Sequence, residues 1–247
     1  MIVAIHQPSY LPWLGYLDRM ARADLFVVLD HVQFERGNFQ NRTMIRIDGP
    51  RGYEQRWLTV PVVQRSQKER ILDKEIDNRL EGARAWGPIH FSTLRHAYRD
   101  APYINLYAKA LKQILEARWE RLVDLDGALL ELLRASFGIR TPLVKSSELG
   151  VEGMKSELVL NICREVGADV FLGGMGGSRR YLDTAAFARA GIGVQWQAFR
   201  HPVYPQCGAA PFVPGLSALD LLLNCGPQSR AFLLARADAP QEALAEA

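Results

Sequence analysis

The sequence predicts an α/β protein with a mostly parallel, Rossmann-like sheet flanked by helices, together with a β-hairpin and a helical insertion. Short runs of apolar and β-branched residues near both ends of the chain are typical of buried strands. Amphipathic stretches alternate with these runs, which favours βαβ units with parallel strands and right-handed crossovers. Helical periodicity takes over between residues 86 and 138, so the insertion separates two parts of one sheet.

The first βαβ unit is predicted at the N-terminus. Residues 2–5 are apolar and end at the proline-containing turn that begins with His6, which predicts a buried strand. Residues 14–21 suit a short helix, and the apolar run 25–29 predicts a second strand that stops at Asp30. Because these strands should be parallel, His6 and Asp30 are expected at the same edge of the sheet.

A hairpin and a group of helices are expected in the middle of the chain. Residues 42–63 contain two strand-like runs on either side of a turn at 48–52. Within 86–138, leucines recur at helical spacing, and Gly138 is suited to end the last of these helices before Pro142.

The second part of the sheet follows the insertion. The expected elements are a strand at 141–144, a helix at 155–167, a strand at 169–172, a helix at 183–190, a strand at 193–199 and a helix at about 216–224. Ser217 is expected to cap the last helix, with Asp220 three residues later as in a capping box. We expect residues 1–236 to form a single domain, and residues 237–247, which lack an apolar stripe, to be a flexible tail.

Composition argues against several classes of protein. No run approaches the roughly 18 apolar residues of a membrane span, and the first residues do not resemble a secretory signal, so we expect a cytoplasmic protein. Cys163, Cys207 and Cys225 are irregularly spaced, so neither disulfides nor a metal site is predicted. A net charge of +3 is far from the basic face of a nucleic-acid-binding protein. A small-molecule partner is therefore expected, and a homo-oligomer is compatible with the sequence.

Three residues are candidates for catalysis. His6 and Asp30 follow predicted strands, at the edge where open α/β sheets bind their ligands. His201 lies in a rigid loop after the strand at 193–199 and is a candidate second base. His90 and His96 lie in the helical insertion and are expected to be structural or surface residues.

Two kinds of loop residue are candidates for substrate binding. The loop after the first strand is stiff and aromatic, as a pocket wall requires, and it supplies Gln7, Tyr10 and Trp13. In the alternative interpretation, its aromatic side chains only cover the edge of the sheet and bind no ligand. Polar side chains in later loops suit sugar hydroxyls and carboxylates, or alternatively stabilise turns; they are Gln33, Asn41, Arg42, Tyr204 and Gln206.

A glycine-rich run after the strand at 169–172 is a candidate phosphate site. Successive backbone N–H groups in such a turn bind phosphate, and arginines can hold it by paired hydrogen bonds. The residues concerned are Gly174, Gly176, Gly177, Ser178, Arg179 and Arg180. The spacing matches neither a P-loop nor G-x-G-x-x-G, and the alternative is a turn with solvated arginines.

Several blocks of the sequence together resemble the WbqC-like family. The blocks are His6-Gln7-Pro8-x-Tyr10-Leu11-Pro12-Trp13-Leu14-Gly15-Tyr16, Asp30-x-Val32-Gln33-Phe34, Gln40-Asn41-Arg42, Trp57-Leu58-Thr59-Val60-Pro61, Gly173-Gly174 through Arg180-Tyr181-Leu182, His201-Pro202-x-Tyr204-Pro205-Gln206, and Phe212-Val213-Pro214-x-Leu216-Ser217-x-Leu219-Asp220-Leu221-Leu222-x-Asn224-Cys225-Gly226. They span residues 1 to about 228. A departure lies at Gly173, where many members are expected to carry serine. The resemblance implies a setting in the biosynthesis of O-antigen and other surface polysaccharides, but no established reaction.

Three functions are compatible with these observations. The favoured one is an enzyme that modifies an (amino)sugar or sugar nucleotide by aminoacyl or acyl transfer, or by ATP-dependent amide formation. Its layout is similar to adenylate-forming folds, in which an early histidine and a later glycine-arginine loop act on phosphates. The alternatives are a sugar-nucleotide-dependent transferase and a non-catalytic binding module of a polysaccharide assembly complex. The cofactor stays open between ATP with Mg²⁺ and an acyl donor.

Overall fold

A five-stranded parallel sheet forms the centre of the computed structural model, which describes residues 1–49, 52–174, 176, 178–208 and 211–235. The strands are β1 (Ile2–His6), β2 (Leu25–Val28), β5 (Leu143–Lys145), β6 (Val170–Gly173) and β7 (Gly193–Trp196). Their spatial order is β5-β2-β1-β6-β7, and every neighbouring pair is parallel. The chain thus proceeds from β1 outward to β5, then returns to the other side of β1, as in doubly wound sheets. The predicted α/β fold is confirmed.

The strand boundaries differ slightly from those predicted. β1 extends to His6 because its last residue pairs with Val28 of β2. The expected strand 193–199 ends at Trp196, opposite Gly173, since β6 itself ends there and leaves the next residues little to pair with.

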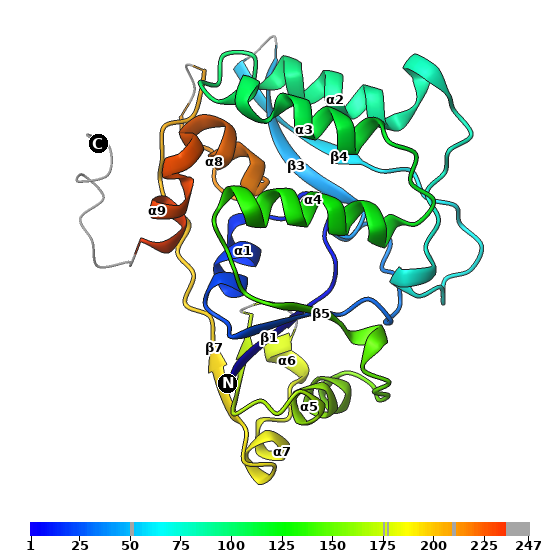
Figure 1. Cartoon of the computed structure of the whole chain (residues 1–247), viewed down its shortest axis with the longest axis vertical. Coiled ribbons are helices and arrows are strands. Elements are labelled where there is room, and N and C mark those ends of the chain that lie inside the picture. Colours follow the sequence, from blue (N-terminus) through cyan, green and yellow to red (C-terminus); the bar gives the residue numbers. More distant parts are fainter. Residues whose placement is uncertain (50–51, 175, 177, 209–210, 236–247) are drawn as a thin grey trace.

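The two faces of the sheet pack against different helices (Figure 1). Val3, Ile5 and Val27 share a hydrophobic cluster with α5 (Ser156–Glu165) and α7 (Thr184–Arg189). Alternate residues point the other way, so Ala4 and Phe26 belong to the larger cluster with α1 (Leu14–Ala21). This alternation is the period of two that β-structure imposes, and both faces are covered as parallel sheets require.

Helices and a hairpin form a second layer beyond α1. The helices are α2 (Trp86–Ala97), α3 (Ile104–Glu116), α4 (Leu122–Ser136), α8 (Ala218–Cys225) and α9 (Ser229–Leu234), and the hairpin strands are β3 (Arg42–Gly49) and β4 (Gly52–Thr59). In the part of the chain that the structure describes, short 3₁₀ turns occupy Ile71–Asp73, Gly82–Arg84, Ser146–Glu148 and Gly226–Gln228. The remaining helix, α6 (Ser178–Tyr181), follows β6. Among the described residues, no helix is long and apolar enough to cross a membrane.

Two of the predicted helix ends can be checked directly. Gly138 adopts φ +61° after α4, and the Ile139 amide donates to the Arg134 carbonyl, as expected of a glycine C-cap. Ser217 caps α8, since its hydroxyl accepts from the Leu219 amide at 3.2 Å. The capping box is not completed, because the Asp220 carboxylate binds Tyr204 and Gln206 instead. The predicted tail at 237–247 lies outside the described residues.

Candidate functional site

The strand order switches direction at β1 and β6, and we call the region beyond the carboxyl ends of these two strands the crevice. The chain leaves these adjacent strands toward opposite sides of the sheet, and ligands of doubly wound sheets bind at such a switch point. His6 ends β1, while Gly173 ends β6 and Gly174 follows it. The predicted catalytic histidine and the start of the predicted phosphate loop therefore lie on neighbouring strands.

His6 is held as a neutral imidazole with a defined tautomer. Its Nδ1 lies 2.9 Å from the Gln7 carbonyl, which can only accept, so Nδ1 carries the proton and Nε2 keeps its lone pair. The ring packs edge-on against Trp13 and Tyr16, with centroids 5.4 and 4.8 Å away. Burial, and secondly the charge of Arg19, lower the pKa of His6 to about 3. His6 is therefore a hydrogen-bond acceptor at neutral pH.

A buried guanidinium stands beside this histidine. Arg19 of α1 is only 8% exposed, and its Nε donates to Oε1 of Gln197 at 3.1 Å. Gln197 is fixed in turn by donating to the Gly15 carbonyl and to the Asp18 carboxylate. A cation is thus held in a low-dielectric position at the switch point, where it acts strongly on any anion.

Glycine at position 174 allows the chain after β6 to approach this cation. A Cβ on Gly174 would lie 2.6 Å from both terminal nitrogens of Arg19, and one on Gly173 would lie 2.7 Å from the Trp196 ring. Because real Cβ atoms do not come so close, only glycine permits this packing without a shift. The glycine pair therefore brings backbone against a guanidinium.

The described residues in the rest of the predicted phosphate loop include two exposed arginines. Arg179 and Arg180 of α6 are exposed, and the Arg179 guanidinium sits 5.8 Å from the centre of the Trp196 ring. Gly176 is exposed, Gly177 lies outside the described residues, and Ser178 begins α6. Burial and the charge of Glu35 raise the pKa of Tyr181, so α6 faces the loop that carries Glu35.

A family comparison bears on this arrangement. The model of the WbqC-like protein family matches residues 7–232, a range that includes Arg19, β6 and Gly174 and begins directly after His6. The chain belongs to this family. Among curated proteins, it is similar to the uncharacterized protein Rv1507c of Mycobacterium tuberculosis (strain ATCC 25618 / H37Rv), at 31% identity over 233 residues that cover 94% of this chain and 96% of the relative. No solved structure matches.

Asp30 of this WbqC-like chain belongs to a second polar cluster, at the ends of β2 and β5. Its carboxylate accepts from the Ser146 hydroxyl at 3.0 Å, and from the Ser147 amide and hydroxyl at 3.0 and 2.7 Å. The Ser146 oxygen also lies 2.6 Å from Nδ1 of His31. These bonds use three of the roughly four acceptor positions of the Asp30 carboxylate, and the residue is only 2% exposed, so any effect on a ligand passes through its serine partners and His31.

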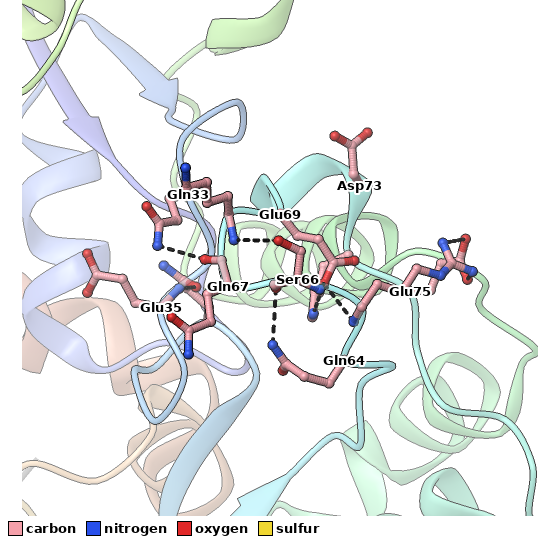
Figure 2. A network of polar contacts seen from close by, with 12 residues as sticks. Gln33, Glu35, Gln64, Ser66, Gln67, Glu69, Asp73 and Glu75 are labelled. Carbon is pink, nitrogen blue, oxygen red and sulfur yellow. Dashed lines mark hydrogen bonds and ion pairs between the residues drawn. The ribbon is translucent and has the colours of Figure 1, made fainter.

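Gln33 is part of a polar network between two loops (Figure 2). Its side chain donates to the Gln67 carbonyl at 2.7 Å. Nearby, the fully buried Lys74 ammonium donates to Glu69 at 2.6 Å, which lowers the pKa of Glu69 to about 2. The network joins the segment after β2 to residues 64–75. The hydrogen bond of Gln33 to Gln67 is part of this connection between the two segments.

Four of the predicted substrate contacts have internal partners. Gln7 accepts from Gln40 at 2.9 Å, and Arg42 lies 4.1 Å over the Trp57 ring. Tyr10, which was expected at a substrate, is fully buried and bonds His90 at 2.8 Å, so a ligand has no access to its side chain. Asn41 is 7% exposed and donates to the Val60 carbonyl at 2.8 Å, and together with Arg42 it lines a pocket of about 350 Å³. The proposed function rests on neither Tyr10 nor Asn41. Trp13, partly buried against His6, is the aromatic residue that remains at the crevice.

His201 forms a third group with the α8 layer. Its Nδ1 lies 2.8 Å from the Pro202 carbonyl, and its Nε2 is buried without a hydrogen-bond partner among the described residues. Tyr204 and Gln206 both donate to Asp220, at 2.8 and 2.7 Å, which holds this loop on α8. Burial lowers the pKa of His201. Among the described residues, its ring packs against Phe199, Tyr204 and Phe212, so His201 belongs to this layer.

Three residues of these clusters were missed by sequence reasoning: Arg19, His31 and Ser146. The neighbours of Arg19 on α1 are all buried, so an arginine in this stretch was the signal in the sequence that pointed to a functional residue. His31 directly follows Asp30, and Ser146 directly follows β5. Examining every residue beyond a predicted parallel strand would have found both.

Proposed function

We propose that this WbqC-like protein is an enzyme that binds a phosphorylated small molecule, first of all a nucleotide, in the crevice beyond β1 and β6. The observation that carries the proposal is the juxtaposition of neutral His6, buried Arg19 and the close-packed Gly174 at the switch point. A buried cation beside close-packed glycine backbone and an acceptor nitrogen suits a phosphate, which needs both charge and hydrogen bonds.

Arg19 and the exposed arginines would have different roles in this proposal. Arg19 is fixed by Gln197, so it loses little freedom when it receives a phosphate oxygen, and its guanidinium geometry matches two oxygens at once. Arg179 and Arg180 lie at the exposed side, where they would attract and then cover the more distal phosphates.

His6 would act on the bound phosphate through Nε2. A phosphate dianion next to His6 opposes the effect of Arg19 and of burial, so it raises the pKa of His6 from about 3 toward the neutral range. The imidazole would then take up a proton as the ligand binds and donate a hydrogen bond to the phosphate as its charge develops in the transition state.

For the reaction, we propose ATP-dependent amide formation or acyl transfer onto an (amino)sugar or sugar nucleotide in surface-polysaccharide biosynthesis. The family resemblance and the crevice support this reading together. A sugar-nucleotide-dependent transferase would use the same phosphate contacts, so the identity of the bound nucleotide and of the released product separates the two reactions.

The test begins with thermal shift and calorimetry of the whole chain with ATP, nucleotide sugars and acyl-CoA, since a ligand that binds the folded state raises its melting temperature. Arg180→Ala should weaken binding of the accepted nucleotide about 10- to 100-fold, the value of a charge-assisted hydrogen bond. Arg189→Ala, an exposed arginine of α7, is the matched control and should leave binding unchanged. His6→Ala should keep most of the affinity while reducing turnover of a carboxylate and an amino sugar by about 10²–10⁴-fold.

Arg19→Met tests the central contact, with unfolding by urea as a check that the variant is folded. Loss of nucleotide binding by a folded Arg19→Met protein supports the proposal, whereas unchanged binding contradicts it. Failure of ATP and nucleotide sugars to bind the wild-type protein at about millimolar concentration would remove both nucleotide-using reactions and leave a CoA-type acyl donor or a binding module.

A further inference from the structure

A pocket lies one strand away from the crevice. It has a volume of about 290 Å³ and is enclosed by residues that follow β1, by the ends of β2 and β5, and by α4. Its walls are largely aliphatic and include Val28, Leu130 and Val144. A cavity of roughly 150 Å³ accommodates benzene, so this pocket has room for one substituted ring.

One wall of the pocket carries a buried carboxyl group. Asp126 of α4 lines the pocket and is only 2% exposed, and both of its carboxyl oxygens are without a hydrogen-bond partner among the described residues. An unpartnered buried carboxylate is costly, so the group takes up a proton instead. Accordingly, burial raises the pKa of Asp126 well above its usual range.

A glycine keeps the same wall open. Gly127 sits inside α4 and lines the pocket, and a Cβ there would meet nothing within 4 Å. Glycine within a helix is unfavourable relative to alanine, and here neither close packing nor a positive φ requires it. Gly127 is exposed, so it lies on the open side of the pocket.

The charges around the pocket favour a cation. The groups that face Asp126 or line the pocket with it are Tyr10, Tyr16, Glu131, Lys145 and Glu148. Glu131 is paired with Arg134, which leaves Glu148 and Lys145 as the other charged lining side chains. Ionisation of Asp126 would therefore make the net charge of the lining negative.

We propose that this pocket is a binding site for a small primary amine with a compact, largely apolar body, and that Asp126 is the carboxylate that receives the ammonium group. Aliphatic walls bury the body, while the ion pair supplies the partner that Asp126 lacks. The pocket adjoins the crevice through Tyr16, whose ring touches His6 and whose pKa is raised by burial and by the nearby Asp126. The role of this pocket as the site of an acceptor amine depends on the proposed function, whereas amine binding in the pocket does not depend on it.

Calorimetry of the full chain at neutral pH tests the proposal, with cyclohexylamine as the probe and cyclohexanol as its neutral match. Cyclohexylammonium should bind at least about 10-fold more tightly than cyclohexanol. Because Asp126 is protonated in the empty pocket and ionised in the ion pair, binding should release about one proton, seen as a dependence of the heat on the ionisation enthalpy of the buffer.

Variants of α4 separate the contributions. Asp126→Asn should weaken cyclohexylammonium binding about 10- to 100-fold, and proton release should disappear. Asp124→Asn, an exposed carboxylate two residues earlier on the same helix, should leave both unchanged. Gly127→Leu should abolish binding of both probes by filling the pocket.

The proposal is overturned if neither probe binds the wild-type protein at about 10 mM, if cyclohexanol binds equally well, or if Asp126→Asn binds cyclohexylammonium as the wild type does. None of these titrations contains a nucleotide, so a negative result would not contradict the phosphate site of the proposed function. Likewise, failure of nucleotides to bind would not contradict amine binding in this pocket.

Discussion

The Ser146 hydroxyl oxygen lies 2.6 Å from Nδ1 of His31. This hydroxyl donates to the Asp30 carboxylate at 3.0 Å and accepts from the Asp30 amide at 3.1 Å. With its proton directed to Asp30, Ser146 can only accept from His31, so in the neutral imidazole it is Nδ1 that carries the proton. The buried Asp30 carboxylate thereby sets the tautomer of a histidine that it does not touch.

Ser146→Ala should change that tautomer and lower stability. His31 loses its acceptor, so the Nε2–H form gains population, and the buried Asp30 carboxylate loses a donor at a cost of about 1–3 kcal/mol in the free energy of unfolding. Long-range ¹H–¹⁵N correlation of the imidazole measures the tautomer, and urea unfolding measures stability.

Ser147→Ala is the matched control for this relay. It also removes a hydroxyl that donates to Asp30, but Ser147 has no bond to His31. A shift of the His31 tautomer in Ser147→Ala as large as in Ser146→Ala would contradict the relay.

Acid should destabilise the protein through its buried imidazoles. Burial lowers the pKa of His90 to about 4, and burial and Arg19 lower that of His6 to about 3, whereas both titrate near 6.5 when unfolded. Between these values the unfolded chain binds more protons than the folded one. The stability contributed by each neutral imidazole is therefore complete above pH 6.5 and is lost as the pH falls toward 4 or 3.

His90→Gln should remove part of this acid sensitivity, on the order of 3 kcal/mol at pH 4. Urea unfolding between pH 7 and pH 4 measures the slope. His96→Gln, which changes an exposed histidine of the same helix, should keep the wild-type slope. Equal slopes for the wild type and His90→Gln would mean that His90 is not the residue that resists protonation.

Two helix glycines should respond oppositely to alanine. A Cβ on Gly87 would lie 1.9 Å from the Leu115 carbonyl oxygen, so Gly87→Ala must push α2 away from α3 at a cost of about 1–3 kcal/mol. Gly127 of α4 meets nothing, so Gly127→Ala should stabilise the protein by up to about 1 kcal/mol. Thermal unfolding of both variants beside the wild type gives the two signs, and destabilisation by Gly127→Ala would show that α4 packs differently.

Much of the fold could be predicted because its signals are local. The apolar runs at 2–5 and 25–29 are strands in the structure, and the helix ends at Gly138 and Ser217 follow from backbone chemistry within a few residues. The expected strand at 193–199 was too long because its end depends on where β6 stops, which is information from a distant segment.

The candidate site could be predicted only in part. His6 and Gly174 were found because they follow strands, and the parallel sheet brings such positions to one edge. Arg19 was not found, since its role depends on Gln197 and Gly174, which are more than a hundred residues away in the chain. Tyr10 was expected at a substrate because a tyrosine in a proline-containing loop does not reveal that His90 covers it.

The sequence by itself determined which segments become strands and helices, where they end, and which of them carry titratable residues, because these properties depend on periodicity and on neighbouring residues. Tertiary structure alone decided the electrostatic state of those residues. Asp126 occupies a leucine-rich helix as an ordinary acidic residue, yet packing leaves its carboxyl buried without a partner among the described residues. Asp30 has the same side chain and receives three donors from Ser146 and Ser147. The difference is one of desolvation and hydrogen bonding, and both arise only when distant segments meet.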